Sequence, residues 1–234
     1  MARAYLQAPT HWLRASLAPA VESEVITHVD CGGTPSTSDP ANWDGAIPWL
    51  TPKEVTGLGD RLYMTHTARS ITPKGLKSCS AQVLPPGTVM LTKRAPIGHV
   101  VINVVPMATN QGFLNFRCGK LLDSLYLAYW LRVNKPYLDL VANGTTYPEL
   151  HQGDLCEFEI AIPPPEEQRT ILHIIKALHY LVALSVPLEQ SITRPEEFCR
   201  LREYSERLCI VRDMMLPMLL SGKMVRRLGG SAMM

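Results

Sequence analysis

Three consecutive prolines, Pro163 to Pro165, divide the chain into two segments with different sequence patterns. Proline has no backbone N–H and a fixed φ, so the triplet ends a hydrogen-bonded strand and favours a stiff, extended backbone. Short apolar runs separated by Gly, Pro, Thr and Asn precede the triplet, and a charged helix start followed by a long apolar periodicity comes after it. The sequence therefore predicts an α+β protein, in which a mixed α/β domain is followed by a helical arm.

The segment before the prolines has the pattern of short strands interrupted by turns. Runs of four to eight apolar residues bounded by Gly and Pro are typical of strands. The clearest runs lie at residues 100–105 and 158–163. In the second run, apolar residues alternate with Glu157, Glu159 and Ala161, which predicts a half-buried strand.

Helices are expected on both sides of the proline triplet. Residues 121–144 space their apolar side chains as a helix does, and Gly144 can close that helix in a left-handed cap. After the triplet a helix begins near Pro165, and Pro187 and Pro195 interrupt its pattern before a second helix. Two helices joined by a short connection fold back on each other, so the arm is predicted to be a helical hairpin or coiled-coil spacer. Its apolar seam, which a partner or a second copy would cover, consists of Ile171, Ile174, Ile175, Leu178, Leu181, Val182, Leu188, Phe198, Leu201, Leu208, Val211 and Met215.

Charge is distributed unevenly along the chain, although the net charge is only +2. Residues 51–100 contain seven Lys and Arg against two Asp and Glu, whereas residues 1–50 contain two against five. A basic block of this kind suits a polyanion, although a solvated basic face has the same composition.

Several classes of site lack the sequence patterns that they need. The six cysteines include no C-x-x-C pair, so neither a zinc site nor disulfides are expected. No phosphate-binding loop, nucleophile elbow or H-E-x-x-H motif is present. His173 and His179 are six residues apart and do not share a helix face at i and i+4. The apolar window at residues 171–186 is shorter than the roughly 20 residues of a membrane span, and we expect a cytoplasmic protein.

Six motifs occur in a fixed order along the chain. They are "GGTPS" (32–36), "IPWLTPKEV" (47–55), "SITPKGLKSCSAQVLPPGTVMLTKRAPIG" (70–98), "ATNQGF" (108–113), "GTTYPEL" (144–150) and "IPPPEEQRTI" (162–171). In this order they closely resemble the specificity subunit of type I restriction-modification systems. The ending "LLSGKM" also resembles the usual close of that family.

The resemblance implies a division of the chain and a set of partners. Residues 25–165 would form a target recognition domain and residues 166–222 a helical spacer and dimerisation arm, with residues 1–24 loosely held and residues 223–234 a flexible tail. The implied partners are double-stranded DNA, DNA methyltransferase subunits and, where present, a restriction subunit. S-adenosylmethionine would be bound by the methyltransferase, and this chain would hold no catalytic residue, cofactor or metal.

The number of domains departs from the family pattern. A typical specificity subunit has two recognition domains and two spacers, whereas this chain has one of each. A half-subunit that pairs with itself and reads an inverted repeat is one interpretation, and a fragment of a longer gene is the other.

Candidate DNA-binding residues come from the basic block and from stretches between the motifs. Cations suit phosphates, and Arg suits bidentate contact with guanine. Lys74 and Gly75 lie in a predicted turn whose tip either touches phosphate or is solvated. Lys93 and Arg94 follow a strand, and pairing of Arg94 with a carboxylate is the alternative to DNA contact. The full set is Ser36, Thr37, Lys53, His66, Thr67, Arg69, Lys74, Gly75, Lys77, Ser78, Lys93, Arg94, Thr145 and Thr146.

Two other functions fit the same features. One is a fragment that occupies an assembly surface or regulates assembly and binds little DNA of its own. The other is the recognition subunit of a related restriction system that cuts on both sides of its site. An enzyme with its own nuclease or methyltransferase activity is not supported, since no catalytic constellation is visible.

Overall fold

The computed structural model describes residues 8–17, 24–59, 61–94, 96–142 and 149–191, without the side chains of residues 155–157 and 181–191. The chain divides into two compact units. One is Arg14–Ile160, and the other combines Met1–Leu13 with Ala161–Met234. Each unit is described by itself. Within the described residues, no helix has both the length and the apolar content to cross a membrane.

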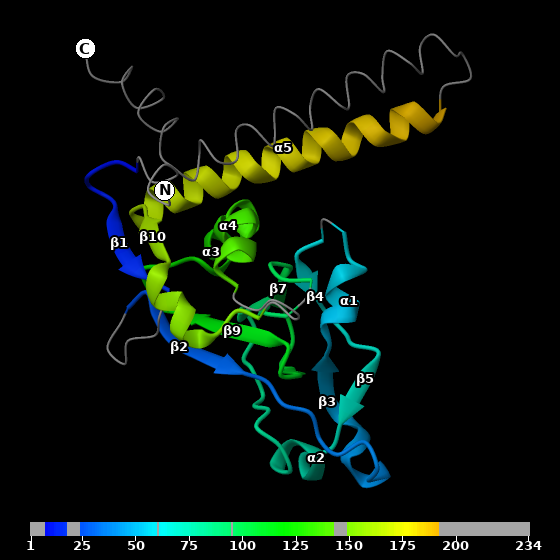
Figure 1. Ribbon diagram of the computed structural model, residues 1–234. Coiled ribbons are helices and arrows are strands. Elements are labelled where there is room, and N and C mark those ends of the chain that lie inside the picture. Colours follow the sequence, from blue (N-terminus) through cyan, green and yellow to red (C-terminus); the bar gives the residue numbers. More distant parts are fainter. Residues whose placement is uncertain (1–7, 18–23, 60, 95, 143–148, 192–234) are drawn as a thin grey trace, which may run out of the picture. The chain divides into compact units, whose positions relative to one another are not determined.

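The unit Arg14–Ile160 is built on a five-stranded sheet with the order β2-β9-β6-β7-β4 (Figure 1). The strands are β2 (Ile26–Cys31), β4 (Tyr63–Met64), β6 (Val89–Thr92), β7 (Val100–Asn103) and β9 (Phe113–Cys118). Neighbours pair antiparallel except β4 and β7, which run parallel. Helix α3 (Ser124–Val133) packs against β6 and β7. The predicted strand at residues 100–105 is confirmed as β7.

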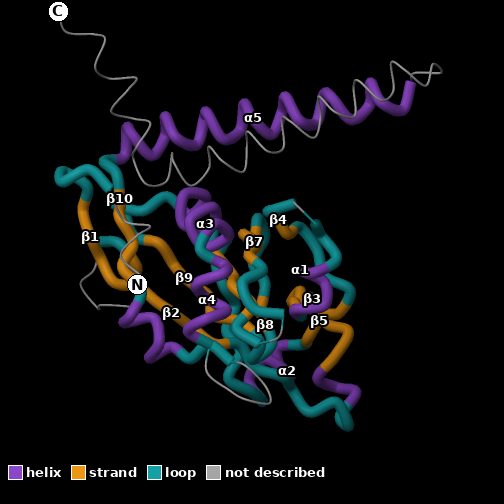
Figure 2. The backbone as a smooth tube through the Cα atoms, turned by 45° about the horizontal axis from the view of Figure 1, so that its top comes forward, coloured by secondary structure: helices purple, strands orange, loops and turns teal. Residues whose placement is uncertain are grey.

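A smaller, three-stranded sheet with the order β5-β3-β8 completes this unit. Its strands are β3 (Trp43–Leu50), β5 (Arg69–Ile71) and β8 (Ala108–Thr109), and beside them lie η2 (Pro40–Asn42), α1 (Pro52–Thr56) and α2 (Pro73–Lys77). Figure 2 shows α1, β3, β4 and β5 together at one end of the unit, away from β2 and β9. The basic block at residues 51–100 supplies most of this end.

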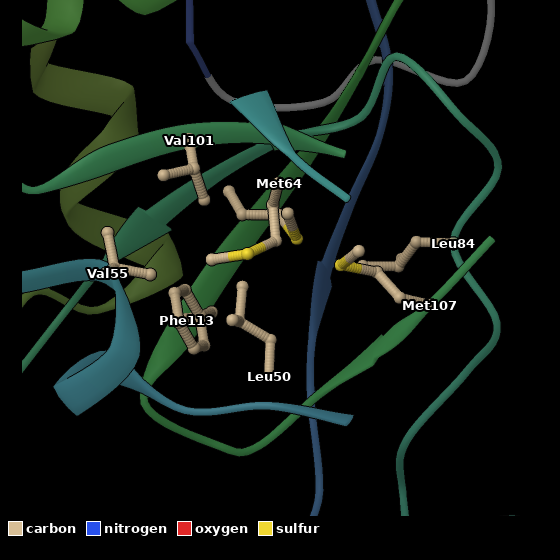
Figure 3. Close-up of a cluster of buried hydrophobic side chains, with 8 residues drawn as sticks. Leu50, Val55, Met64, Leu84, Val101, Met107 and Phe113 are labelled. Carbon is tan, nitrogen blue, oxygen red and sulfur yellow. The ribbon is translucent and has the colours of Figure 1, made fainter. Parts of the chain in front are cut away.

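Two clusters of buried apolar side chains support the sheets. The first, shown in Figure 3, joins α1, β4 and both sheets and consists of Leu50, Val55, Met64, Leu84, Met90, Val101, Met107 and Phe113. The second lies in the smaller sheet and consists of Trp43, Trp49, Ile71, Ala81 and Ala108. Burial of this apolar surface is the main stabilising contribution to the fold. The first cluster anchors α1 through Val55 and β4 through Met64.

The single helix predicted over residues 121–144 is wrong, because the structure has two helices there. Helix α3 ends at Asn134, whose side chain donates to the Trp130 carbonyl over 2.8 Å. Helix α4 (Lys135–Val141) follows and carries Pro136 in its first turn. Proline cannot continue the hydrogen-bond ladder of a preceding helix but is tolerated at a helix start. The cap expected at Gly144 lies outside the described residues.

The strand predicted at residues 158–163 is confirmed as β10 (Glu159–Ile162), which pairs with β1 (Leu13–Ser16). The predicted alternation is wrong at one position, because Ala161 is 1% exposed and buried like its apolar neighbours. A small methyl group fits a buried position on either face of a strand. Strand β1 lies within residues 1–24, and the expectation that this segment is loosely held stays a prediction. A 3-10 helix, η3 (Gln152–Glu157), precedes β10.

The second unit contains α5 (Pro165–Ser191), which begins where the sequence predicts. Glu167 in its first turn accepts hydrogen bonds from the Trp12 indole over 2.9 Å and pairs with His11 over 2.8 Å. The interruption expected at Pro187 is wrong, since α5 continues to Ser191. A proline so close to the end of a helix removes one hydrogen bond without ending the helix.

The predicted arm seam is described only in its first part. Ile171 and Ile175 are buried, and Ile174 and Leu178 are partly buried. Leu181, Val182 and Leu188 belong to α5, but their side chains are not described. Pro195 and the second helix, with Phe198, Leu201, Leu208, Val211 and Met215, lie outside the described residues. The hairpin and its seam stay predictions.

Candidate nucleic-acid interface

A groove of about 500 Å³ lies beside α1 and β4, at the β4 edge of the five-stranded sheet. It is lined by Lys53, Glu54, Gly57, Leu58, Arg61, Tyr63, Met64, Thr65, His66 and Ala68. Three of these ten residues are basic and one is acidic, and we call it the basic groove.

Helix α1 forms one wall of the basic groove. Its start is closed by Glu54, whose carboxylate accepts hydrogen bonds from the backbone N–H of Thr51 over 3.0 Å and from its hydroxyl over 2.8 Å. Glu54 also accepts from the backbone N–H of Ala68 over 2.7 Å, which ties the two walls together. Val55 is buried in the core, whereas Lys53 is exposed. The carboxylate of Glu54 is therefore occupied by hydrogen bonds that hold the two walls of the groove.

The segment containing β4 forms the other wall. Its backbone carbonyls at Leu62 and Met64 accept hydrogen bonds from Ile102 over 2.7 Å and from Val104 over 3.0 Å. Successive strand side chains point to opposite faces, so Met64 enters the core while Tyr63 remains 50% exposed. The packing of Met64 in the core therefore positions the exposed ring of Tyr63 in the groove, where Lys53 and Arg61 also lie.

The basic side chains of the groove take no part in the ion pairs of the described residues. Those ion pairs do not include Lys53, Arg61 or His66. Arg61 donates to the Leu58 carbonyl over 3.4 Å, and His66 contacts the Thr65 hydroxyl over 2.9 Å. Exposed cations with a hydroxyl and an aromatic ring are the groups that proteins direct at phosphates and sugars.

A second group of predicted residues meets around Trp43, next to the basic groove. The Trp43 indole donates to the Ser36 carbonyl over 3.0 Å, and the Arg69 guanidinium lies over the Trp43 ring. Ser36 and Thr37 are exposed beside it. Thr67 stabilises the local structure. Its hydroxyl donates to the Arg69 carbonyl over 2.6 Å and accepts from the backbone N–H of Trp49 over 3.0 Å.

The predicted turn around Lys74 is a short helix, α2, whose first turn is capped by the Thr72 hydroxyl. A Cβ at Gly75 would lie 2.3 Å from the Asn42 carbonyl oxygen, so the close approach that this glycine permits is to the chain's own backbone. Lys74 pairs with Asp39 over 2.8 Å, and this hydrogen bond lowers the pKa of the Asp39 carboxyl. Ser78 caps the other end of α2, and Lys77 is exposed.

Lys93 and Arg94 lie in an ion cluster apart from the basic groove. Lys93 Nζ is 2.9 Å from one oxygen of Glu149, and Arg94 Nε is 3.0 Å from the other. The Lys93 side chain is 11% exposed. Burial opposes ionisation of Glu149, but the two hydrogen bonds outweigh it and hold the pKa of this carboxyl below its usual range. Pairing of Arg94 with a carboxylate is therefore what the structure shows.

In the motif "ATNQGF", Asn110 stabilises a turn, because its side-chain oxygen accepts a hydrogen bond from the Gly112 N–H over 2.8 Å. Thr145 and Thr146 lie outside the described residues. Within the described residues, His, Cys, Asp and Glu form no group of three or more that could hold a metal ion.

Of the polar groove residues, the candidate set from sequence contains Lys53 and His66 and omits Glu54, Arg61, Tyr63 and Thr65. It also omits the indole of Trp43. Arg61 belongs to the basic block, which was a usable signal. The alternation of Leu62 and Met64 around Tyr63 was another, since it places the tyrosine on the outer face. Nothing local in the sequence pairs Trp43 with Arg69, which are brought together by the register of β3 and β5.

A basic groove on a mixed α/β unit is typical of a protein that binds nucleic acid. Residues 23–194 match the family described as the type I restriction modification DNA specificity domain, and the chain belongs to this family. The resemblance seen in the motifs is thereby confirmed.

Several known proteins are similar to this chain. The MjaIX specificity subunit of a type I restriction enzyme from Methanocaldococcus jannaschii is 40% identical over 67% of this chain and 37% of its own length. The HindI specificity subunit from Haemophilus influenzae is 24% identical over 85% of this chain and 40% of its own length. The chain thus spans about two fifths of these two relatives.

Solved structures have a similar fold. The HsdS subunit from Thermoanaerobacter tengcongensis matches with a TM-score of 0.55 at 23% identity, covering 92% of this chain and 46% of that chain. A chain from a study of complex assembly and conformational transition of the type I R-M system matches with a TM-score of 0.58 at 23% identity, covering 91% and 46%.

Proposed function

We propose that this chain is a non-catalytic DNA recognition component of a type I restriction-modification complex, and that it reads one half of a split target. The observation that carries the proposal is the basic groove, in which Lys53, Arg61 and His66 face solvent while the acid Glu54 is held by hydrogen bonds. Membership of the DNA specificity family supports the choice of DNA over other polyanions.

The phosphate backbone is the ligand that the groove cations suit best. Lys and Arg neutralise phosphates and release condensed counterions, so affinity falls as salt rises. Base identity is read by other side chains that reach the base edges. The groove would therefore position the unit on duplex DNA without itself selecting a sequence.

The helical arm has a different part in the proposal. We infer that residues 166–222 form a hairpin whose apolar seam pairs with a second copy or with methyltransferase subunits, and that residues 25–165 form the recognition domain. The first part of α5 has the apolar face that the proposal requires, although Ile171 and Ile175 on it are already buried within this chain. The methyltransferase would supply S-adenosylmethionine, and a restriction subunit would join where the system has one.

The test is a salt titration of DNA binding by the full chain. Fluorescence anisotropy with a labelled random-sequence duplex is measured from low to high salt, alone and after co-expression with a methyltransferase subunit. We expect log affinity to fall linearly with log salt, with a slope near −0.9 for each phosphate contact. Salt-independent or undetectable binding in both preparations would favour an assembly-surface fragment instead.

A further inference from the structure

The guanidinium of Arg69 lies over an aromatic ring beside the basic groove. Its guanidinium carbon lies 3.6 Å from the centroid of the Trp43 ring and 5.5 Å from that of Trp49. A guanidinium stacked on a ring directs its N–H donors outward in its own plane, which leaves them available to a ligand. Arg69 is exposed, and the ion pairs within the described part of the chain do not include it.

The aromatic support under Arg69 is fixed. The Trp43 indole donates to the Ser36 carbonyl over 3.0 Å, and the Trp49 indole donates to the Gly33 carbonyl over 2.9 Å. The two rings meet edge to face with centroids 5.0 Å apart, and Trp43 is 8% exposed. Neither ring can turn without breaking a hydrogen bond, so the surface on which the guanidinium rests is preorganised.

The backbone of Arg69 is fixed as well. Its carbonyl accepts from the Thr67 hydroxyl over 2.6 Å, and Arg69 lies opposite Trp49 in the pairing of β5 with β3. The preceding residue, Ala68, lines the basic groove and donates its N–H to Glu54. Arg69 therefore follows directly on the wall of the groove that would hold phosphates.

We propose that Arg69 is a specificity-determining residue that recognises a guanine in the DNA target. The inference rests on the proposed DNA-binding function. A planar fork of donors matches the O6 and N7 acceptors of guanine in the major groove, and this is the commonest specific contact that arginine makes. A lysine in the same place would keep the charge but lose the fork.

Two other uses of Arg69 have distinct signatures. If its side chain only covers Trp43, an unbranched apolar residue of similar length serves equally well. If it only contacts phosphate, its loss weakens binding to all sequences alike and lowers the salt slope by about 1.

The test is enrichment of bound duplexes from a random library at one salt concentration. Wild type, Arg69→Lys, Arg69→Met and the charge control Lys120→Met are compared, and each unfolding midpoint is measured. Lys120 follows β9, far from the β4 edge in the order of the sheet. Arg69→Met retains an apolar side chain in contact with Trp43, and Arg69→Lys retains the positive charge. The unfolding midpoints show which variants retain the fold.

We expect a guanine position in the wild-type motif that both Arg69 variants lose and Lys120→Met keeps. Affinity for the wild-type motif should fall about 10-fold or more in both variants. Affinity of Arg69→Lys for random duplex should be unchanged.

An unchanged motif in Arg69→Lys and Arg69→Met would overturn the assignment while leaving DNA binding intact. A uniform loss over all sequences would overturn it in favour of a phosphate contact. Failure of the wild type to bind any duplex, both alone and after co-expression with a methyltransferase subunit, would refute the proposed function and the assignment with it.

Discussion

The cations of the ion cluster, Lys93 and Arg94, and those of the basic groove come from the same basic block at residues 51–100, yet their charges are used in opposite ways. In the cluster, one carboxylate holds two cations, one of them nearly buried. In the groove, the carboxylate is held by backbone groups and a hydroxyl, and the cations face solvent. An excess of basic residues in a sequence therefore does not by itself predict a basic surface, since some of those residues are neutralised by carboxylates within the fold.

Replacing the shared carboxylate should have the largest effect. Glu149→Ala leaves Lys93 buried without a partner, and we expect the free energy of unfolding to fall by about 3 kcal/mol. Chemical denaturation measures the change. The double variant Lys93→Met/Glu149→Leu should recover most of the loss, because no unpaired charge remains. If Glu149→Ala alone were as stable as the wild type, the ion cluster would not contribute to stability, and the contrast with the groove would be wrong.

Removing groove cations should affect binding rather than folding. For Lys53→Gln/Arg61→Gln we expect DNA affinity about 10-fold weaker at physiological salt and a salt slope smaller by about 2. The unfolding midpoint should not change, because both side chains are exposed. The control is Lys120→Gln, which removes an exposed lysine after β9 and should bind like the wild type.

Acid should weaken the ion cluster. The folded-state pKa of Glu149 lies below its ordinary value, so its contribution to stability is present above the unfolded pKa and is lost as pH falls through the folded pKa. The difference in unfolding free energy between wild type and Glu149→Ala should be constant above about pH 6 and shrink below about pH 5. The effect is smaller than the full loss of the pair. A difference that grows in acid would contradict the assigned direction.

The smallest effect is expected at Lys74. Its pair with Asp39 is exposed, with 62% of the lysine side chain open to solvent. Exposed pairs contribute little to stability, so Lys74→Gln should leave the unfolding midpoint unchanged. Because Asp39 already neutralises this lysine, the salt slope of DNA binding should also stay as in the wild type. A slope reduced by about 1 would add α2 to the DNA contacts.

Much of the fold follows from local sequence, whereas the site follows from it only in part. Turn residues and apolar runs predicted β7, β10 and the start of α5, because strand pattern and proline chemistry act locally. Pro136 is the sequence signal that separates α3 from α4. Pro187 lies near the end of a long helix and does not end it.

The site depends on contacts between distant parts of the chain. Lys53 and Arg94 have the same chemistry in the sequence, and only the approach of Glu149 distinguishes them. Gly75 is buried against Asn42, a contact 33 residues away that no turn signature reveals. The pairing of β5 with β3 brings Arg69 to the indole rings of Trp43 and Trp49. Charge can be counted from a sequence, but its neutralisation is set by the tertiary fold.

Lysine acetylation with and without duplex DNA, quantified by mass spectrometry, tests the central claim most directly. The basic groove should contact DNA while the ion cluster and the β2 and β9 end of the sheet should not. We predict that DNA protects Lys53 strongly and leaves Lys120, which follows β9, as reactive as in the free protein. Protection of Lys120 with Lys53 unchanged would place the DNA on another face and contradict the account.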